Sequence, residues 1–204
     1  MRAKICGITN LDDACYAVQC GAWALGFNFY SKSPRWIEPN AAASIIRQLP
    51  SNVLKVGIVV DTNHVELETF MTDVGLDLIQ VYQPMNVSLS LKQRMILCVH
   101  AAVEEDLPSH DVLSEYGYVL LDAPKLADGL LGGTGRLSHW TLAATLAQRY
   151  RLLLAGGLTP SNVQTAIQTV QPYAVDVASG VQCTPARVSH SLLFDFLRQV
   201  NHAS

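Results

Sequence analysis

Two side chains of this chain suit acid and base chemistry, and each ends a run of apolar residues. Cys6 closes the segment from Arg2 and stands directly before Gly7, while Asp122 follows the apolar residues 118–121. A thiolate removes protons, and a carboxyl group whose pKa is raised by burial or by a nearby anion donates them. A free cysteine of unknown surroundings is more often core packing, but a strand end beside a glycine favours a reactive thiol.

Glycine-rich turns follow three of the late apolar runs. They are residues 132–135 with Gly133, the pair Gly156 and Gly157, and the pair Ser179 and Gly180. Backbone N–H groups in such turns bind phosphate, above all after the seventh and eighth strands of a β/α barrel. No lysine or arginine lies between residues 152 and 181, so the backbone itself would hold the anion.

Arg35 lies in a long segment, residues 30–40, that follows the second apolar run. Its type and spacing fit a solvated surface arginine and a clamp for a substrate carboxylate equally well. The six histidines form no metal-ligand spacing, and the five cysteines include no C-x-x-C pair, so we expect no metal and free thiols.

Eight short apolar runs alternate with amphipathic segments from end to end, which is typical of β/α units around a parallel sheet. The expected strands are Arg2–Cys6, Ala24–Phe29, Leu54–Val60, Leu78–Tyr82, Met95–Val99, Tyr118–Leu121, Leu152–Ala155 and Ala174–Ala178. The expected helices are Leu11–Gln19, Ala41–Leu49, His64–Val74, Trp140–Arg149, Ser161–Val170 and Val188–Val200. Eight such units predict an α/β fold, a closed (β/α)8 TIM barrel, with a shortened or irregular fourth unit because residues 83–94 are weakly patterned.

The composition narrows the class of protein. With 204 residues, 50% hydrophobic and 15% charged, we expect one domain over residues 1–204. A net charge of -3 without a Lys/Arg run argues against nucleic acid and membrane partners, so a small molecule is the expected ligand. The N-terminus lacks a secretory signal pattern, which predicts a cytoplasmic protein.

In these motifs the chain resembles phosphoribosylanthranilate isomerase, an enzyme family of tryptophan biosynthesis. The resemblance extends over most of the chain. Six segments carry it: residues 4–9 (KICGIT), 26–35 (GFNFYSKSPR), 121–123 (LDA), 132–135 (GGTG), 154–163 (LAGGLTPSNV) and 175–181 (VDVASGV).

The resemblance implies a TIM barrel that converts N-(5-phosphoribosyl)anthranilate to 1-(2-carboxyphenylamino)-1-deoxyribulose 5-phosphate by an Amadori rearrangement, without a cofactor. It implies that Asp122 is the general acid and Cys6 the general base. It also implies that Arg35 pairs with the anthranilate carboxylate. The remaining substrate-binding residues that it implies are Gln80, Gly133, Gly156, Gly157, Ser179 and Gly180.

The chain departs from the family after the fourth strand, where residues 80–83 read Gln-Val-Tyr-Gln in place of the usual Gln-Leu-His-Gly. Near the last helix, residues 184–188 also replace the usual Pro-Gly-x-Lys-Asp. Two alternatives to the isomerase stay open at this point: an isomerase of another phosphorylated sugar or aminosugar, and a noncatalytic phosphoribosyl-ligand binding module. Monomer and homodimer are both compatible with the sequence.

Overall fold

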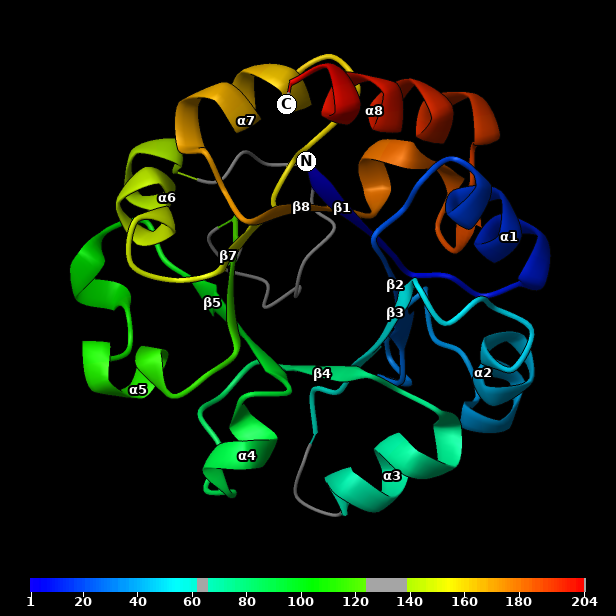
Figure 1. Ribbon diagram of the computed structural model, residues 1–204, viewed down its shortest axis with the longest axis horizontal. Helices are drawn as coiled ribbons and strands as arrows, with labels where there is room; N and C mark the ends of the chain where they lie inside the picture. The colour runs from blue at the N-terminus through cyan, green and yellow to red at the C-terminus, as the bar shows by residue number, and fades with distance from the viewer. Residues whose placement is uncertain (62–65, 124–138, 204) are drawn as a thin grey trace.

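Parallel strands close into a barrel, and helices surround it (Figure 1). The structure, a computed structural model, describes residues 1–61, 66–123 and 139–203. Neighbouring strands pair in chain order, and β8 pairs with β1 to close the ring. The strands are β1 (Arg2–Cys6), β2 (Ala24–Asn28), β3 (Leu54–Ile58), β4 (Leu78–Val81), β5 (Met95–His100), β6 (Tyr118–Asp122), β7 (Leu152–Leu154) and β8 (Ala174–Val177). The predicted fold class is confirmed.

The helices lie on the outside of the barrel (Figure 1). They are α1 (Leu11–Gln19), α2 (Pro39–Ile46), α3 (Leu67–Val74), α4 (Leu89–Lys92), α5 (His110–Ser114), α6 (Trp140–Ala147), α7 (Val163–Val170) and α8 (His190–His202), with a 3-10 turn η1 (Glu104–Asp106) before α5. With four residues α4 is the shortest of them, which matches the irregular fourth unit that the sequence predicts.

Both faces of the strands are buried, which explains why the strands are almost wholly apolar. One apolar cluster lies between the strands and the helices. A second cluster fills the barrel interior and takes alternate residues from successive strands, among them Ala24, Val56, Ile96, Leu120 and Leu153. Alternation of side chains along a strand therefore fixes which residues face the interior.

Local capping follows the sequence at two of the predicted helix ends. Asn10 caps α1, because its Oδ1 accepts the Asp13 N–H at 2.9 Å. Gly75 ends α3 in the left-handed region at a φ of 85°, where glycine is favoured. The helix α7 begins at Val163, two residues after the predicted start at Ser161. The reason is that Asn162 accepts the Thr159 N–H and closes a turn before the helix.

A short hairpin follows β8, where the sequence predicts only the start of the last helix. It consists of η2 (Ser179–Val181), β9 (Gln182–Thr184) and β10 (Arg187–Val188). Val188 was expected to begin the helix, but it pairs with Gln182 and donates its N–H to Asp13 Oδ2 at 3.0 Å. The helix α8 therefore starts two residues later, at His190.

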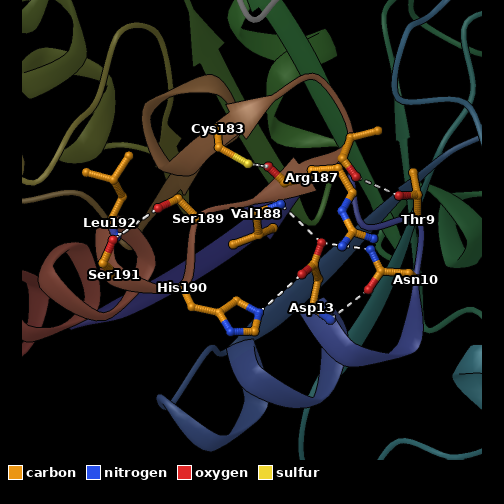
Figure 2. Close-up of polar contacts among 11 residues, drawn as sticks. Thr9, Asn10, Asp13, Cys183, Arg187, Val188, Ser189, His190, Ser191 and Leu192 are labelled. Atoms are coloured by element: carbon orange, nitrogen blue, oxygen red, sulfur yellow. Dashed lines mark hydrogen bonds and ion pairs between the residues drawn. The ribbon is translucent and has the colours of Figure 1, made fainter.

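Asp13 fastens this hairpin to α1 (Figure 2). Its buried carboxylate also accepts from Asn10 Nδ2 at 2.7 Å and meets His190 Nε2 at 3.2 Å. Thr9 adds a hydroxyl bond to the Ala186 carbonyl at 2.7 Å. These contacts hold the segment that follows β8 against the loop after β1 and the start of α1.

Candidate active site

Cys6 lies at the carboxyl end of β1, and alternation along the strand places its side chain on the same face as that of Lys4. Lys4 is fully buried, and its Nζ contacts Gln80 Oε1 of β4 and Asp176 Oδ1 of β8. Because those strands lie on different sides of the ring, Lys4 points into the barrel. Cys6 therefore faces the interior as well, one layer nearer the carboxyl-end mouth.

Two glycines leave room around the thiol. A Cβ at Gly26 of β2 would lie 3.1 Å from the Cys6 sulfur, and a Cβ at Gly7 would lie 2.6 Å from Cδ of Arg35. Gly7 has a φ of 84°, which glycine adopts without strain. Burial raises the pKa of Cys6 and the Asp176 charge adds to this, whereas the charges of Lys4 and Arg35 lower it; the net direction is upward.

Asp122 ends β6 with its side chain facing the same interior, because Leu120, two residues before it, belongs to the interior cluster. Its Oδ1 accepts the Ala123 N–H at 2.8 Å. Burial raises the pKa of Asp122 and outweighs the lowering by this hydrogen bond and by His100, its register partner on β5. A carboxyl group in this position holds its proton more readily than an exposed one.

Tyr82, just beyond β4, stands among the reactive groups. Its ring stacks on His100 with centroids 5.9 Å apart, and its hydroxyl accepts from Gln80 Nε2 at 3.3 Å. Burial raises the pKa of its phenol well above the usual value, and the charges of Cys98, Cys6, Asp122 and Asp176 add to this. Cys6 and Asp122 each end an interior-facing strand of the closed barrel, so their side chains lie at the same carboxyl-end mouth as Tyr82.

The turns after β7 and β8 form one small pocket with Asp122 and Asp176. We call Gly156, Gly157, Ser179 and Gly180, which line it, the glycine cradle. Gly156 and Gly157 have φ values of 87° and 63°, in the region that favours glycine. A Cβ at Gly180 would lie 1.9 Å from the Leu158 carbonyl oxygen, so the two turns meet backbone to backbone.

Further hydrogen bonds hold the first of these turns. Asn162 Nδ2 donates to the Gly157 carbonyl at 2.9 Å, while Asn162 Oδ1 accepts the Thr159 N–H at 2.8 Å. A turn fixed in this way presents its backbone dipoles to a ligand without first having to be ordered.

Arg35 lies half-buried over Gly7, and the hairpin orients it. Its Nε donates to Gln182 Oε1 at 2.9 Å, and its backbone N–H is held by Ser33 Oγ at 3.1 Å. The Nε2 atom of Gln182 is buried and has no hydrogen-bond partner within the described residues. Sequence reasoning missed Gln182, because the hairpin that carries it was not predicted.

Gln80, which the resemblance implies to be a substrate-binding residue, lies beneath the reactive groups on β4. It is 3% exposed, its Oε1 accepts from Lys4, and its Nε2 donates to Tyr82. Both ends of the amide are thus engaged by the protein itself. Gly133, also expected to bind substrate, lies outside the described residues.

Lys4 and Asp176 are the principal site residues that sequence reasoning missed. With Gln80 they make a layer beneath Cys6 that we call the charged floor, in which Lys4 Nζ lies 2.8 Å from Asp176 Oδ1. One signal was available: a lysine and an aspartate stand within strands that are otherwise almost wholly apolar.

Neither a metal-binding cluster of His, Cys, Asp and Glu nor a helix long and apolar enough to cross a membrane occurs in residues 1–61, 66–123 and 139–203.

Comparisons with known proteins agree on one family. The family model for N-(5'phosphoribosyl)anthranilate (PRA) isomerase matches residues 3–184. A protein of that name from Geobacter sulfurreducens is 40% identical, covering 98% of this chain and 98% of its own length. The one from Pelobacter propionicus is 39% identical over 97% of this chain and 94% of its own length.

Solved structures show the same likeness. Phosphoribosyl anthranilate isomerase from Thermotoga maritima superimposes with a TM-score of 0.86 at 36% identity, and 99% of each chain is covered. A second structure has a TM-score of 0.84 at 34% identity over 99% of both chains. It holds reduced 1-(o-carboxyphenylamino)-1-deoxyribulose 5-phosphate.

Proposed function

The chain belongs to the N-(5'-phosphoribosyl)anthranilate isomerase family, and from this premise we propose how its own residues catalyse the reaction. The enzyme converts N-(5-phosphoribosyl)anthranilate to 1-(2-carboxyphenylamino)-1-deoxyribulose 5-phosphate in tryptophan biosynthesis. The observation that carries the proposed mechanism is the placement of Cys6 and Asp122 around one phenol beside the glycine cradle.

Asp122 acts first, as general acid. Its carboxyl group donates a proton to the ribose ring oxygen; the bond between C1 and that oxygen breaks, and the nitrogen lone pair forms a C1=N iminium. The raised pKa of Asp122 supports this role, because the group must hold a proton before it gives one.

Cys6 acts second, as general base. Its thiolate takes the proton from C2, the electron pair of that bond forms a C1=C2 double bond, and the iminium electrons return to nitrogen. The resulting enol tautomerises to the ketone, which completes the rearrangement. Each positioned acid or base contributes on the order of 100- to 10,000-fold to such a step.

The substrate would span the pocket from Arg35 to the glycine cradle. Arg35, oriented by Gln182, would pair with the anthranilate carboxylate. The glycine cradle would hold the phosphate by its backbone N–H groups, since it carries no cationic side chain. Because Asp122 lines the same pocket, a bound phosphate would favour the protonated form of its carboxyl group.

We assign Gln80 to the charged floor and not to the substrate. We also propose that the chain works as a single domain in the cytoplasm, where its five free cysteines stay reduced. A solved relative is described as monomers of the dimeric isomerase of Thermotoga maritima. Sedimentation of this chain distinguishes a monomer from a homodimer.

Turnover of N-(5-phosphoribosyl)anthranilate, followed by the loss of anthranilate-type fluorescence, tests the mechanism. We expect Cys6→Ala and Asp122→Asn each to lower kcat on the order of 100- to 10,000-fold. Cys183→Ala is the matched control, because Cys183 is exposed and outside the pocket, and we expect it to leave kcat unchanged. Full activity in either of the first two variants would exclude the proposed acid and base.

A further inference from the structure

Lys4 carries a charged side chain in the barrel interior, where charged groups are rare. It is fully buried inside the barrel, and the whole of its environment is protein. An isolated ammonium there would be strongly disfavoured, so a buried lysine needs partners that stabilise its charge. Asp176 Oδ1 at 2.8 Å and Gln80 Oε1 at 3.1 Å supply them.

These partners keep Lys4 in its charged form. Burial by itself lowers the pKa of Lys4, but the charges of Asp176 and Cys6, and hydrogen bonds to both, raise it above the ordinary value. The ammonium is therefore a fixed positive charge throughout the range in which enzymes of this kind work.

The fixed charge lies directly beneath the proposed base. Lys4 and Cys6 are two residues apart on β1 and face the same side of the strand. The Lys4 charge and a hydrogen bond from its ammonium lower the pKa of Cys6, against the opposing influence of burial and of Asp176. Gly26 leaves the sulfur free of a side chain from the neighbouring strand.

We propose that Lys4 is a positioning residue for the reaction: its ammonium, held by Asp176 and Gln80 beneath Cys6, increases the fraction of Cys6 that is present as thiolate. The inference rests on the function of Cys6 proposed above. Lys4 itself does not touch the substrate and acts through the sulfur.

Other titratable or charged groups also face the barrel interior near Cys6 and influence its ionisation. They are Asp176 of β8, Arg35 of the loop after β2, Tyr82 beyond β4, Cys98 and His100 of β5, and Asp122 of β6. Among the causes that shift the pKa of Cys6, the Lys4 charge is the largest that favours the thiolate.

The proposed role of Lys4 predicts a change in the pH profile of turnover. The ordinary pKa of a cysteine, 9.0, lies far above that of an aspartate, 3.8, and both pKa values are raised here, so we expect Cys6 to titrate at higher pH than Asp122. The active form, with Cys6 ionised and Asp122 protonated, is then a minority form between the two pKa values, and the alkaline limb of kcat/KM reports Cys6. Loss of Lys4 must move that limb to higher pH, with about a tenfold change in the thiolate fraction for each pH unit. Because the Lys4 charge also lowers the pKa of Asp122, the acid limb should move to higher pH as well, and the plateau should change by the difference between the two shifts.

Alkylation of Cys6 by iodoacetamide measures its ionisation independently of turnover. The rate is followed against pH by mass spectrometry of the peptide that contains Cys6, in wild type and in Lys4→Met. We expect the midpoint to lie at higher pH in Lys4→Met. The exposed thiol of Cys183, in the same samples, is expected to show no shift.

Lys55→Met is the matched control for the loss of a lysine from a strand. Lys55 lies on β3 and pairs with Asp77 at 3.1 Å, but its neighbours Leu54 and Val56 hold the interior side, so it faces away from Cys6. We expect this variant to leave both the alkylation midpoint and the alkaline limb unchanged. An unshifted midpoint in Lys4→Met would overturn the inference and leave Lys4 a structural residue.

A second variant covers the case in which Lys4→Met does not fold, because that substitution leaves Asp176 buried without its cation. The double variant Lys4→Met/Asp176→Leu removes both charges, and a smaller shift in the same direction is expected, because Lys4 has the larger influence on Cys6. An unshifted midpoint here would also overturn the inference. Failure of the proposed function is distinct: it would appear as full turnover in Cys6→Ala, whatever the alkylation midpoints.

Discussion

The charged floor and the glycine cradle are held by different means, although Asp176 of the floor also lines the pocket of the cradle. The floor relies on side chains: Lys4 pairs with Asp176 in the buried interior beneath Cys6. The cradle relies on backbone: two turns meet where Gly180 faces the Leu158 carbonyl, and none of the described residues that line the pocket has a cationic side chain. The contrast is between a fixed positive charge beneath the Cys6 thiol and a glycine cradle, without a cationic side chain, beside the Asp122 carboxyl group.

A cationic phosphate site would work against Asp122, because a positive charge beside that carboxyl group would lower its pKa. The neutral cradle attracts the phosphate through dipoles and adds no formal charge. The fixed cation lies beneath Cys6, where its charge favours the ionised form that the base requires. The same charge also lowers the pKa of Asp122, but burial, the largest cause, raises that pKa. Substitutions in the charged floor should therefore change the charge balance around Cys6. Substitutions in the glycine cradle should change the shape of the phosphate site.

The largest effect on stability is expected from Asp176→Ala, which leaves the Lys4 ammonium buried without its carboxylate. Loss of one partner of a buried pair costs about 3–5 kcal/mol. Urea unfolding of wild type, Asp176→Ala and Lys4→Met/Asp176→Leu measures this, and the double variant should recover most of the loss because it buries no charge. A loss no larger in the single variant than in the double one would contradict a floor held by charge pairing.

A smaller effect is expected from Gly180→Ala in the glycine cradle. A Cβ there would stand 1.9 Å from the Leu158 carbonyl oxygen, so the two turns must separate, at a cost of about 1–3 kcal/mol for overpacking. We expect KM for the substrate to rise while the alkaline limb of the pH profile stays in place. Gly21→Ala is the control for an added methyl group without a clash: Gly21 has a φ of 91°, which strains an alanine, but nothing lies within 4 Å of the added Cβ, and KM should not change.

The smallest effect concerns Asp122 and is a gain in stability. Because its folded pKa is raised above the unfolded value, the native protein binds more protons between those two values, and its stability falls as the pH rises through that window. Asp122→Asn lacks this dependence, so its free energy of unfolding should exceed that of wild type increasingly toward neutral pH. Urea unfolding of both proteins over a pH series measures the difference; a difference of the opposite sign would mean that the carboxylate is stabilised by the fold.

The strands, the two residues proposed as acid and base, and the glycine turns could be predicted from short stretches of sequence, because each depends on neighbouring residues. The eight strands follow from apolar runs, and Cys6 and Asp122 stood out because each ends such a run. The glycine turns after β7 and β8 were equally visible, since their conformations require residues without a side chain.

The parts that were missed depend on contacts between distant residues. Lys4 and Asp176 are register partners only because β8 closes the ring against β1, and no periodicity within either strand indicates that pairing. The hairpin of β9 and β10 was also missed, and with it Gln182 and its bond to Arg35, because its strands are short and largely exposed.

A crystal structure of this chain with reduced 1-(o-carboxyphenylamino)-1-deoxyribulose 5-phosphate, the ligand held by a solved relative, tests the central claim most directly. We expect the phosphate on the backbone N–H groups of the glycine cradle, the carboxylate on Arg35, and the Cys6 sulfur and Asp122 carboxyl group on either side of the reacting carbons. A ligand bound with Cys6 or Asp122 out of reach of those carbons would contradict it.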